Sequence, residues 1–201
     1  MNEPTGRRER KKAATRRKIA DTALRLFLER DYDTVGIRDV AAGADVAVTT
    51  VFAHFASKEA LVFEQDQDFE QRLVRAVTDR APDEPLLPAL HREVRALVHH
   101  CTGEAAEPVR RMITASPALL QYEETMRLRH ARSLAAALTD DPGLGRSALT
   151  CRALARFVID AYALAGEAAD PDGALDEVFR MVEAAWSATE AFGHPAARAG
   201  R

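Results

Sequence analysis

The fold is decided by residues 15–62, which read TRRKIADTALRLFLERDYDTVGIRDVAAGADVAVTTVFAHFASKEALV. Apolar residues recur at helical spacing in three successive segments of this stretch. They predict one amphipathic helix over 15–29 and two short helices over 37–44 and 48–54. Asp31, Tyr32 and Asp33 interrupt the pattern after the first helix, and Gly36 is suited to cap the second.

The two short helices and the tight turn between them form a candidate helix-turn-helix unit. Apolar residues stand where these helices must pack on each other and on the first helix: Val40, Ala41, Ala44, Val46 and Val51. The second short helix then turns Val48, Thr49 and Ala53 outward. Small side chains let a helix enter the major groove, where threonine bonds to base edges or phosphates. Many helical proteins contain two short helices and a turn, so spacing alone leaves a purely structural role open.

The detailed string resembles the DNA-binding domain of the TetR family of bacterial transcriptional regulators. The shared features, in order, are Leu26-Phe27, Tyr32, Ile37-Arg38-Asp39-Val40-Ala41, Val46, Thr50-Val51-Phe52, His54-Phe55 and Ser57-Lys58-Glu59-Ala60-Leu61. The residues after this stretch match the family only in the length, number and order of their helices. The resemblance implies an all-α fold of about nine helices, with a three-helix helix-turn-helix DNA-binding head before a larger helical ligand-binding and dimerisation domain.

The resemblance also implies which residues contact DNA: Arg16, Arg17, Arg38, Val48, Thr49, Thr50, Phe52, His54 and Lys58. Thr49 is the expected reader of a base edge. Arg38, His54 and Lys58 are expected at phosphates. Phe52 stands where the family often has tyrosine, so any contact there lacks a hydroxyl.

Two residues depart from the family pattern. Asp45 replaces the usual turn glycine, and aspartate tolerates the left-handed conformation better than most residues. Ala47 replaces a serine or threonine N-cap and cannot accept a capping hydrogen bond. We expect the turn to survive, with Asp45 as a candidate substitute acceptor. Without a substitute, the start of the recognition helix is weakened by roughly 1 kcal/mol.

Charge is distributed unevenly along the chain. Residues 1–18 hold eight Lys and Arg against two Glu, whereas residues 61–201 hold 16 basic and 22 acidic residues. A basic arm on an acidic body suggests that one end meets a polyanion, although a solvated tail has the same composition. We therefore predict a disordered basic arm over 1–14, a DNA-binding domain over 15–62, a ligand-binding and dimerisation domain over 63–192, and a flexible tail over 193–201.

Proline and glycine separate the remaining helical segments. Ser57 is expected to cap a long helix that ends at the break in residues 81–85. Further helices are predicted over 88–102, 106–115, 117–139, 145–168 and 172–192.

The body must supply a pocket and a dimer interface if the chain follows the family. Candidate pocket residues are Leu97, His100, Cys101, Met112, Ile113, Tyr122, Met126, Arg129 and Phe157. Candidate interface residues lie on the last two helices: Leu154, Phe157, Val158, Ala161, Leu175, Val178, Phe179, Val182 and Trp186. Ordinary core packing is the better explanation for each apolar pocket residue. It also explains part of the interface set, so the interface assignment rests on the family resemblance.

Several other classes of protein are disfavoured. No apolar run approaches the roughly 20 residues of a membrane span. The chain lacks a glycine-rich phosphate loop, HExxH and GxSxG, so we expect neither an enzyme nor a cofactor. His99 and His100 are adjacent on a predicted helix and diverge, which argues against a metal site. Cys101 and Cys151 fit a reducing compartment.

We therefore expect a cytoplasmic, nucleoid-associated regulator, most simply a repressor. As a homodimer it binds a palindromic double-stranded operator, and a small hydrophobic effector releases it. Activation instead of repression stays open, because both need the same head. The alternative function is a helical dimer that binds a small molecule or a partner and carries a degenerate DNA-binding head.

Overall fold

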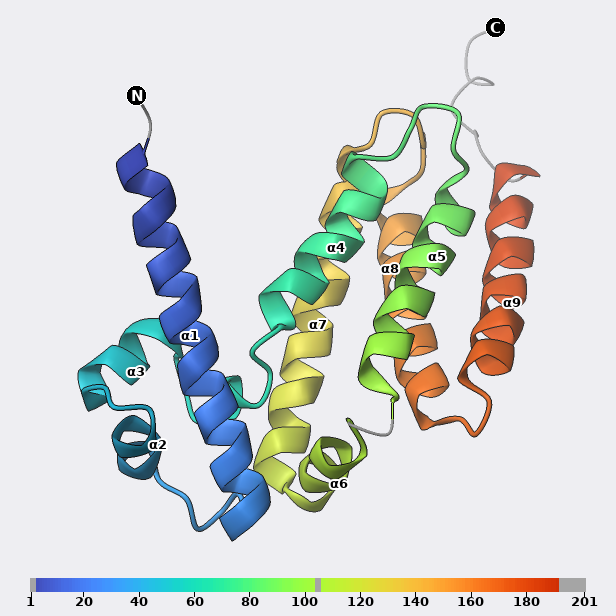
Figure 1. Cartoon of the computed structure of the whole chain (residues 1–201). Helices are drawn as coiled ribbons and strands as arrows, with labels where there is room; N and C mark the ends of the chain where they lie inside the picture. The colour runs from blue at the N-terminus through green and yellow to red at the C-terminus, as the bar shows by residue number, and fades with distance from the viewer. Residues whose placement is uncertain (1–2, 104–105, 192–201) are drawn as a thin grey trace, which may run out of the picture. The chain divides into compact units, whose positions relative to one another are not determined.

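The computed structural model describes residues 3–103 and 106–191, and this part of the chain is helical throughout, without a strand (Figure 1). Its elements are α1 (Glu3–Arg30), α2 (Ile37–Gly43), α3 (Val48–His54), the 3₁₀ turn η1 (Glu59–Leu61), α4 (Asp66–Thr78), α5 (Leu86–Cys101), α6 (Glu107–Ala115), α7 (Pro117–Asp140), α8 (Ala148–Glu167) and α9 (Pro171–Ala191). The predicted all-α fold is confirmed. None of the described helices combines the length and apolarity needed to cross a bilayer.

The chain divides into two compact units, Met1–Asp66 with Glu104–Glu124, and Gln67–Gly103 with Thr125–Arg201. The first unit thus contains α6 and the first turns of α7, which the predicted boundary at residue 62 assigned to the second domain. The reason is packing between residues distant in sequence. Leu119 is completely buried in the core of the first unit, and Met112 and Ile113 pack against the same core.

The core of the first unit forms where one face of α1 meets the helix-turn-helix. Ile19, Ala23 and Phe27, spaced four residues apart on α1, are at most 1% exposed. The residues predicted to pack the two short helices are buried with them, apart from the half-buried Val46: Val40, Ala41, Ala44 and Val51. The amphipathic pattern therefore fixed both the helices and the faces they bury.

Helix α1 begins at Glu3, which corrects the prediction of a disordered arm over 1–14. Alanine, lysine and arginine fill residues 7–14 apart from Glu9, and all of these have high helix propensity. Because no proline or glycine follows Gly6, nothing in this segment stops the helix from extending beyond its packed part. The side chains of residues 6–14 are exposed.

The long helix predicted from Ser57 is also corrected. Ser57 Oγ accepts a hydrogen bond from the N–H of Ala60 at 3.3 Å, as expected of a cap, but it opens only the short turn η1. Residues 62–65 form a bend before α4 begins at Asp66. Arg16 donates a hydrogen bond to the carbonyl of Glu64 at 3.3 Å, and Phe63 stacks on Tyr122 at 5.4 Å. These contacts hold the bend in a conformation that local propensity does not favour.

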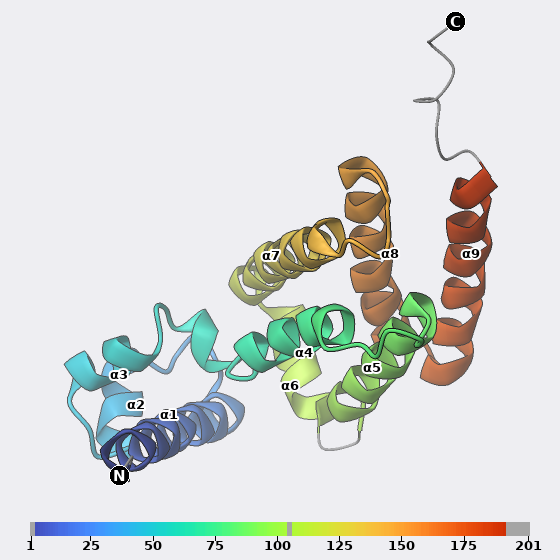
Figure 2. The same ribbon diagram turned by 90° about the horizontal axis from the view of Figure 1, so that it is seen from above.

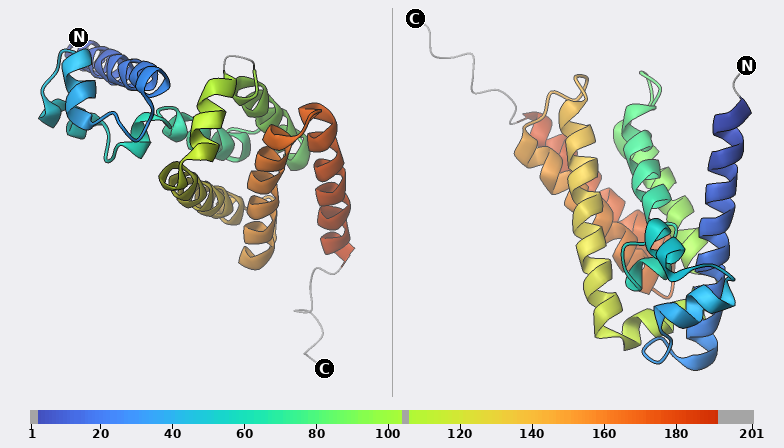
Figure 3. Two further views of the ribbon diagram at one scale, coloured as in Figure 1. Left: turned by 90° about the horizontal axis from the view of Figure 1, so that it is seen from below. Right: turned by 90° about the vertical axis from the view of Figure 1, so that its left-hand side faces the viewer.

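The second unit contains α4, α5, most of α7, and the helical pair α8 and α9. Figures 2 and 3 show α8 and α9 side by side and antiparallel, and both also contact α5. Ser147 caps α8 by accepting a hydrogen bond from the N–H of Thr150 at 3.1 Å. The core of this unit is made of Leu, Val, Ala and Ile residues from these helices, with Phe179 and Cys151.

Candidate nucleic-acid interface

The turn between α2 and α3 has the geometry that a helix-turn-helix requires. Asp45 has φ 52°, the left-handed conformation in which the family pattern places glycine, so the predicted tolerance of aspartate is confirmed. The N–H of Val46 donates to the carbonyl of Ala41 at 3.0 Å and closes the turn. At the start of α2, Asp39 accepts a hydrogen bond from the N–H of Gly36 at 2.8 Å.

Helix α3 starts without a side-chain cap. Ala47 adopts the extended conformation of an N-cap, with φ −70° and ψ 149°, but has no acceptor. The Asp45 side chain makes no hydrogen bond to another described residue, so it does not replace the missing cap. The N–H of Thr50 donates to the carbonyl of Ala47 at 2.9 Å, so the N–H groups left open to solvent or to a ligand are those of Val48 and Thr49.

The outward face of α3 is small and mostly apolar. Thr49, Phe52 and Ala53 are exposed, and Phe52 is 54% exposed despite its size. Val48 and Thr50 are half-buried, and Val51 is buried in the core. Thr49 thus presents its hydroxyl on the free face of the helix, whereas Val48 packs partly on the core.

Arg16, predicted to contact DNA, instead joins α1 to the end of α3. Its guanidinium donates to the carbonyl of His54 and lies 4.1 Å from the centre of the Phe55 ring. Its Nε is 3.5 Å from a carboxylate oxygen of Glu64. The neighbouring Arg17 is exposed. Arg16 therefore positions the recognition helix, and Arg17 is the free cation of the pair.

Lys58 also points into the protein. Its Nζ donates to the carbonyl of Tyr32 and lies 4.1 Å from the centre of the Tyr32 ring. The Tyr32 hydroxyl donates in turn to Glu59 Oε1 at 3.1 Å. Burial lowers the pKa of Lys58, against the attraction of Asp33, Glu59 and Asp31. This arrangement ties η1 to the turn after α1.

His54 stands at the end of α3, half-buried. Burial lowers its pKa, and the positive charges of Arg16 and Lys12 lower it further. His54 is therefore a neutral imidazole at pH 7, next to the positive charges of Arg16 and Lys12.

Glu59 of η1 has a lowered pKa. Burial alone would raise it, but hydrogen bonds from Ser57 and Tyr32, with the charge of Lys58, lower it overall.

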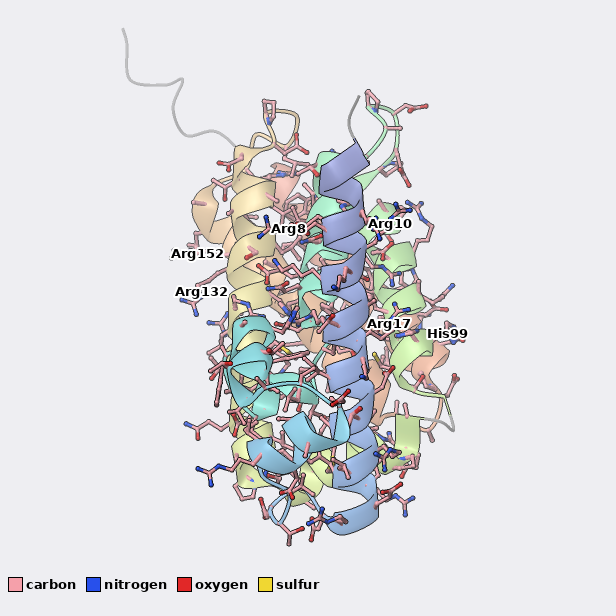
Figure 4. The ribbon with its side chains drawn as sticks, turned by 60° about the vertical axis from the view of Figure 1, so that its left-hand side comes forward. Arg8, Arg10, Arg17, His99, Arg132 and Arg152 are labelled. Atoms are coloured by element: carbon pink, nitrogen blue, oxygen red, sulfur yellow. The ribbon has the colours of Figure 1, made fainter. Side chains whose placement is uncertain are left out.

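Basic side chains cover the exposed part of α1. Figure 4 shows Arg8 on one side of this helix and Arg10 and Arg17 on the other. Lys12 is one helical turn from both Arg8 and Arg16, and it acts on His54 of α3. Arg38 is exposed near the start of α2. The first unit thus carries exposed cations on α1 and α2.

The predicted pocket residues are divided between the two units. Met112, Ile113 and Tyr122 belong to the first unit, whereas the others belong to the second: Leu97, His100, Cys101, Met126, Arg129 and Phe157. His100, Cys101 and Phe157 are exposed, and Leu97 is core. Within the first unit, a cleft of about 380 Å³ between the end of α1 and α6 includes Met112.

A polar cluster in the second unit was missed by the sequence reasoning. His130 of α7 is 3% exposed and stacks on Phe69 of α4 at 4.9 Å, and Tyr162 of α8 meets Phe69 edge-on at 4.7 Å. Beside them, Glu70 Oε2 lies 3.1 Å from Arg129 Nε. No single sequence motif marks this cluster, because its members come from three helices.

Most predicted interface residues lie inside the second unit. Those at most 6% exposed are Leu154, Val158, Ala161, Leu175, Phe179 and Val182. Val178 and Trp186 pack partly on the same core, and Arg146 lies 4.9 Å from the centre of the Trp186 ring. Only Phe157 is an outward residue, 54% exposed. The pattern could not separate the two faces because α8 is apolar on both.

Comparisons with known proteins agree with the helix-turn-helix described in the first unit. The family model "Bacterial regulatory proteins, tetR family" matches residues 19–64, from the first buried residue of α1 to the bend before α4. The transcriptional regulator TcmR of Streptomyces glaucescens is 29% identical over 143 residues, 65% of this chain, and the chain spans only 63% of its length. The transcriptional repressor Rv3405c of Mycobacterium tuberculosis is 31% identical over 135 residues, 67% of this chain and 68% of that protein.

Solved structures share the fold. A TetR-family regulator from Streptomyces coelicolor has a TM-score of 0.61 at 20% identity, over 86% of this chain and 94% of that one. The TetR-family repressor AlkX from Dietzia has a TM-score of 0.59 at 19% identity, over 85% of this chain and 97% of that one. Together with the helix-turn-helix geometry and the sequence match to Rv3405c, these likenesses identify the chain as a member of the TetR family of bacterial transcriptional regulators.

Proposed function

We propose that the chain is a ligand-responsive repressor that binds a palindromic operator as a homodimer. The observation that carries this is the outward face of α3, where Thr49, Phe52 and Ala53 are exposed on a helix held by the core. Small residues admit the helix to the major groove, Thr49 reaches a base edge, and Phe52 meets apolar groups such as thymine methyls. Arg17 and Arg38 supply phosphate contacts. Such a protein acts in the cytoplasm, at the nucleoid.

Two copies are needed because one short helix reads only a few base pairs. A two-fold dimer places two recognition helices about one helical turn of DNA apart. Large apolar residues are exposed on the outer faces of α8 and α9: Leu149 (68%), Phe157 (54%), Leu164 (53%) and Met181 (67%). An exposed set of this size on two adjacent helices is typical of a protein contact. This face, in place of the buried residues, is our proposed dimer interface.

The effector is proposed to contact the cluster around His130. Phe69, His130 and Tyr162 offer aromatic surfaces, and the partly exposed pair of Glu70 and Arg129 offers charged groups beside them. Pockets for small molecules combine apolar walls with a few placed polar groups in this way. A hydrophobic effector with one polar group fits this chemistry. It releases DNA only if it binds the DNA-free conformation more tightly than the DNA-bound one.

The test is selection of bound sequences from a random duplex library by the purified protein at near-physiological salt. A palindrome with half-sites about one helical turn apart is expected. The selected duplex then serves as the probe for compounds that release it. Tyr162→Ala should lower the potency of such a compound while leaving operator affinity unchanged. Weak, salt-sensitive binding without a preferred sequence would overturn the proposal.

A second candidate function also has structural support. The uncapped start of α3 and the phenylalanine at position 52 are both departures that weaken polar DNA contacts. A helical dimer that binds a small molecule or a partner, with a degenerate head, would retain the α8 and α9 face. The same selection separates the two functions, because the degenerate head enriches no sequence.

A further inference from the structure

The cleft of about 380 Å³ in the first unit contains none of the residues proposed above to contact DNA or the effector. Figures 1 and 3 show α6 beside the C-terminal end of α1, and both helices line the cleft together with the turn that follows α1. All of these segments belong to the same compact unit. A cleft of this volume is large enough for a small organic molecule.

The two helices supply an apolar lining. Phe27 and Leu28 come from the end of α1, and Met112 and Ala115 come from α6. Leu28 is large but 45% exposed, so it lines the cleft and is not part of the core. Met112 is half-buried and packs only partly on the core of the unit. Such a lining accepts an aliphatic or aromatic group of a ligand.

The turn after α1 adds two carboxylates to the lining, those of Asp31 and Asp33. None of the described residues donates a hydrogen bond to either carboxylate or forms an ion pair with it. Lys58 is attracted to both, but its ammonium group donates to the carbonyl of Tyr32 and does not line the cleft. Arg111 does line it and is paired with Glu107, whose Oε1 lies 3.6 Å from the Arg111 Nε. The cleft therefore has an excess of negative charge and suits a cation.

Asp31 stands at a position where stability favours a different residue. It directly follows Arg30, the last residue of α1, and its φ is 79°. Glycine, or less often asparagine, is the usual residue in this conformation after a helix. The negative end of the helix dipole also disfavours a carboxylate there. Asp31 therefore costs stability through both its backbone and its charge, and such costs are characteristic of binding sites.

A buried hydroxyl group also lines the cleft. Ser116, between α6 and α7, is 5% exposed. Its Oγ accepts a long hydrogen bond from the N–H of Leu119, at 3.5 Å, but its hydroxyl donates to no described residue. Buried donors normally have an acceptor, because an unmade hydrogen bond costs free energy. The Ser116 hydroxyl is thus available to a polar atom of a ligand in the cleft.

We propose that this cleft binds a small organic ammonium ion with an apolar body. The carboxylates of Asp31 and Asp33 accept hydrogen bonds from the ammonium group, and the body packs against Leu28 and Met112. The site lies in the unit that carries the recognition helix, separate from the proposed effector cluster around His130 in the second unit. This inference goes beyond the proposed function and requires neither an operator nor a dimer.

NMR of methionine methyl groups in the full chain tests the site. The chain has four methionines, and Met112 is the one among the lining residues. The probe is phenethylammonium, and phenethyl alcohol, in which a neutral hydroxyl replaces the ammonium group, is the matched comparison. The Met112 signal should shift on titration with phenethylammonium, and the alcohol should bind at least about tenfold more weakly. An unmoved Met112 signal, or equal affinity for the two compounds, would overturn the proposal. A shift confined to Met126 would do the same, because that residue belongs to the second unit.

Asp31→Asn removes the charge and keeps a residue type that tolerates the left-handed conformation. It should weaken phenethylammonium binding at least about fivefold. Its thermal midpoint should be no lower than that of the wild type, so lost binding is not lost folding. Asp21→Asn, the same change at an exposed position of α1 outside the cleft, is the control and should bind as the wild type does.

Ala115→Leu tests the cleft itself, because it adds a larger side chain to the lining and should weaken the binding of both compounds. Wild-type affinity in both Asp31→Asn and Ala115→Leu would overturn the proposed site. A failed operator selection leaves these measurements unaffected, since they use no DNA. Failure of phenethylammonium to bind would in turn leave the operator-binding proposal intact.

Discussion

Arg16 of α1 lies over the ring of Phe55, 4.1 Å from its centre, and its guanidinium also donates to the carbonyl of the preceding residue, His54. The family resemblance assigns Arg16 to DNA contact, but here it joins the first helix to the end of the recognition helix. Its neighbour Arg17 is exposed and free to meet a phosphate. Two adjacent residues of the same type therefore have separate roles in the head.

Replacing Arg16 by alanine should lower the free energy of unfolding by about 2 kcal/mol, because a charged hydrogen bond and a cation–π contact are lost. Arg17→Ala is the matched control and should change stability by less than about 0.5 kcal/mol. Urea denaturation measures both. In operator titrations, Arg17→Ala should reduce the dependence of affinity on salt by about one phosphate contact. Equal stability of the two variants would show that the Arg16 contacts do not hold α3.

Thr49→Ala should relax the preference at one operator position by about 1–3 kcal/mol, because a base-edge contact disappears. Binding to a set of single-base operator variants measures this loss. Lys58→Ala is the comparison. Since the Lys58 ammonium group bonds to Tyr32, this variant should lose stability and keep the salt dependence of the wild type. A reduced salt dependence in Lys58→Ala would instead show that Lys58 contacts a DNA phosphate.

Ala47→Ser should restore the missing cap of α3. The backbone at Ala47 already has N-cap dihedral angles, so a serine hydroxyl would accept a hydrogen bond from a first-turn N–H without rearrangement. We expect a gain of about 1 kcal/mol in the free energy of unfolding and tighter operator binding. Ala42→Ser, exposed within α2, should be neutral or slightly destabilising. No gain at position 47 would mean that solvent already satisfies these groups.

The helix-turn-helix could be predicted from sequence because its determinants are local. The apolar spacing that predicts α2 and α3 lies within each helix. Asp45 is one of the few residue types that tolerate the left-handed conformation, so its own identity indicates the turn. The base-reading candidate Thr49 follows from the same spacing. Those assignments needed no knowledge of what packs against the head.

The roles of Arg16 and Lys58 could not be predicted, because their partners are 38 and 26 residues away in sequence. The sequence alone indicates a phosphate contact for each residue. Only the folded chain shows that each one instead contacts a backbone carbonyl and an aromatic ring. The two faces of α8 pose the same problem. Leu154 and Phe157 are equally apolar in sequence, and only the position of the neighbouring helices makes one buried and the other exposed.

The carboxylates of α9 should stabilise the second unit through α5. The guanidinium of Arg95 pairs with both carboxylates, and its Nε lies 3.2 Å from Asp172 Oδ1. Asp172→Asn with Asp176→Asn should lower the free energy of unfolding by up to about 1 kcal/mol for each partly exposed pair, and the thermal midpoint should fall with it. High salt should reduce the difference from the wild type, because screening weakens the lost attraction. A difference that persists at 1 M salt would indicate lost packing instead.

The stability of the head should fall in mild acid because of His54. Its pKa is lowered in the folded protein by burial and by Arg16 and Lys12, so the unfolded chain binds the proton more readily. The free energy of unfolding therefore drops as the pH falls through the ordinary histidine pKa of 6.5. His91 has a lowered pKa as well and contributes in the same direction.

The variant His54→Gln isolates the first contribution. Urea denaturation at pH 7.5, 6.5 and 5.5 should show a smaller acid loss in this variant than in the wild type. Lys12→Ala should raise the pKa of His54, which its NMR titration reports directly. Operator DNA should raise that pKa too, because a phosphate near the imidazole favours the charged form. An identical acid loss with and without His54 would place the pH response elsewhere in the chain.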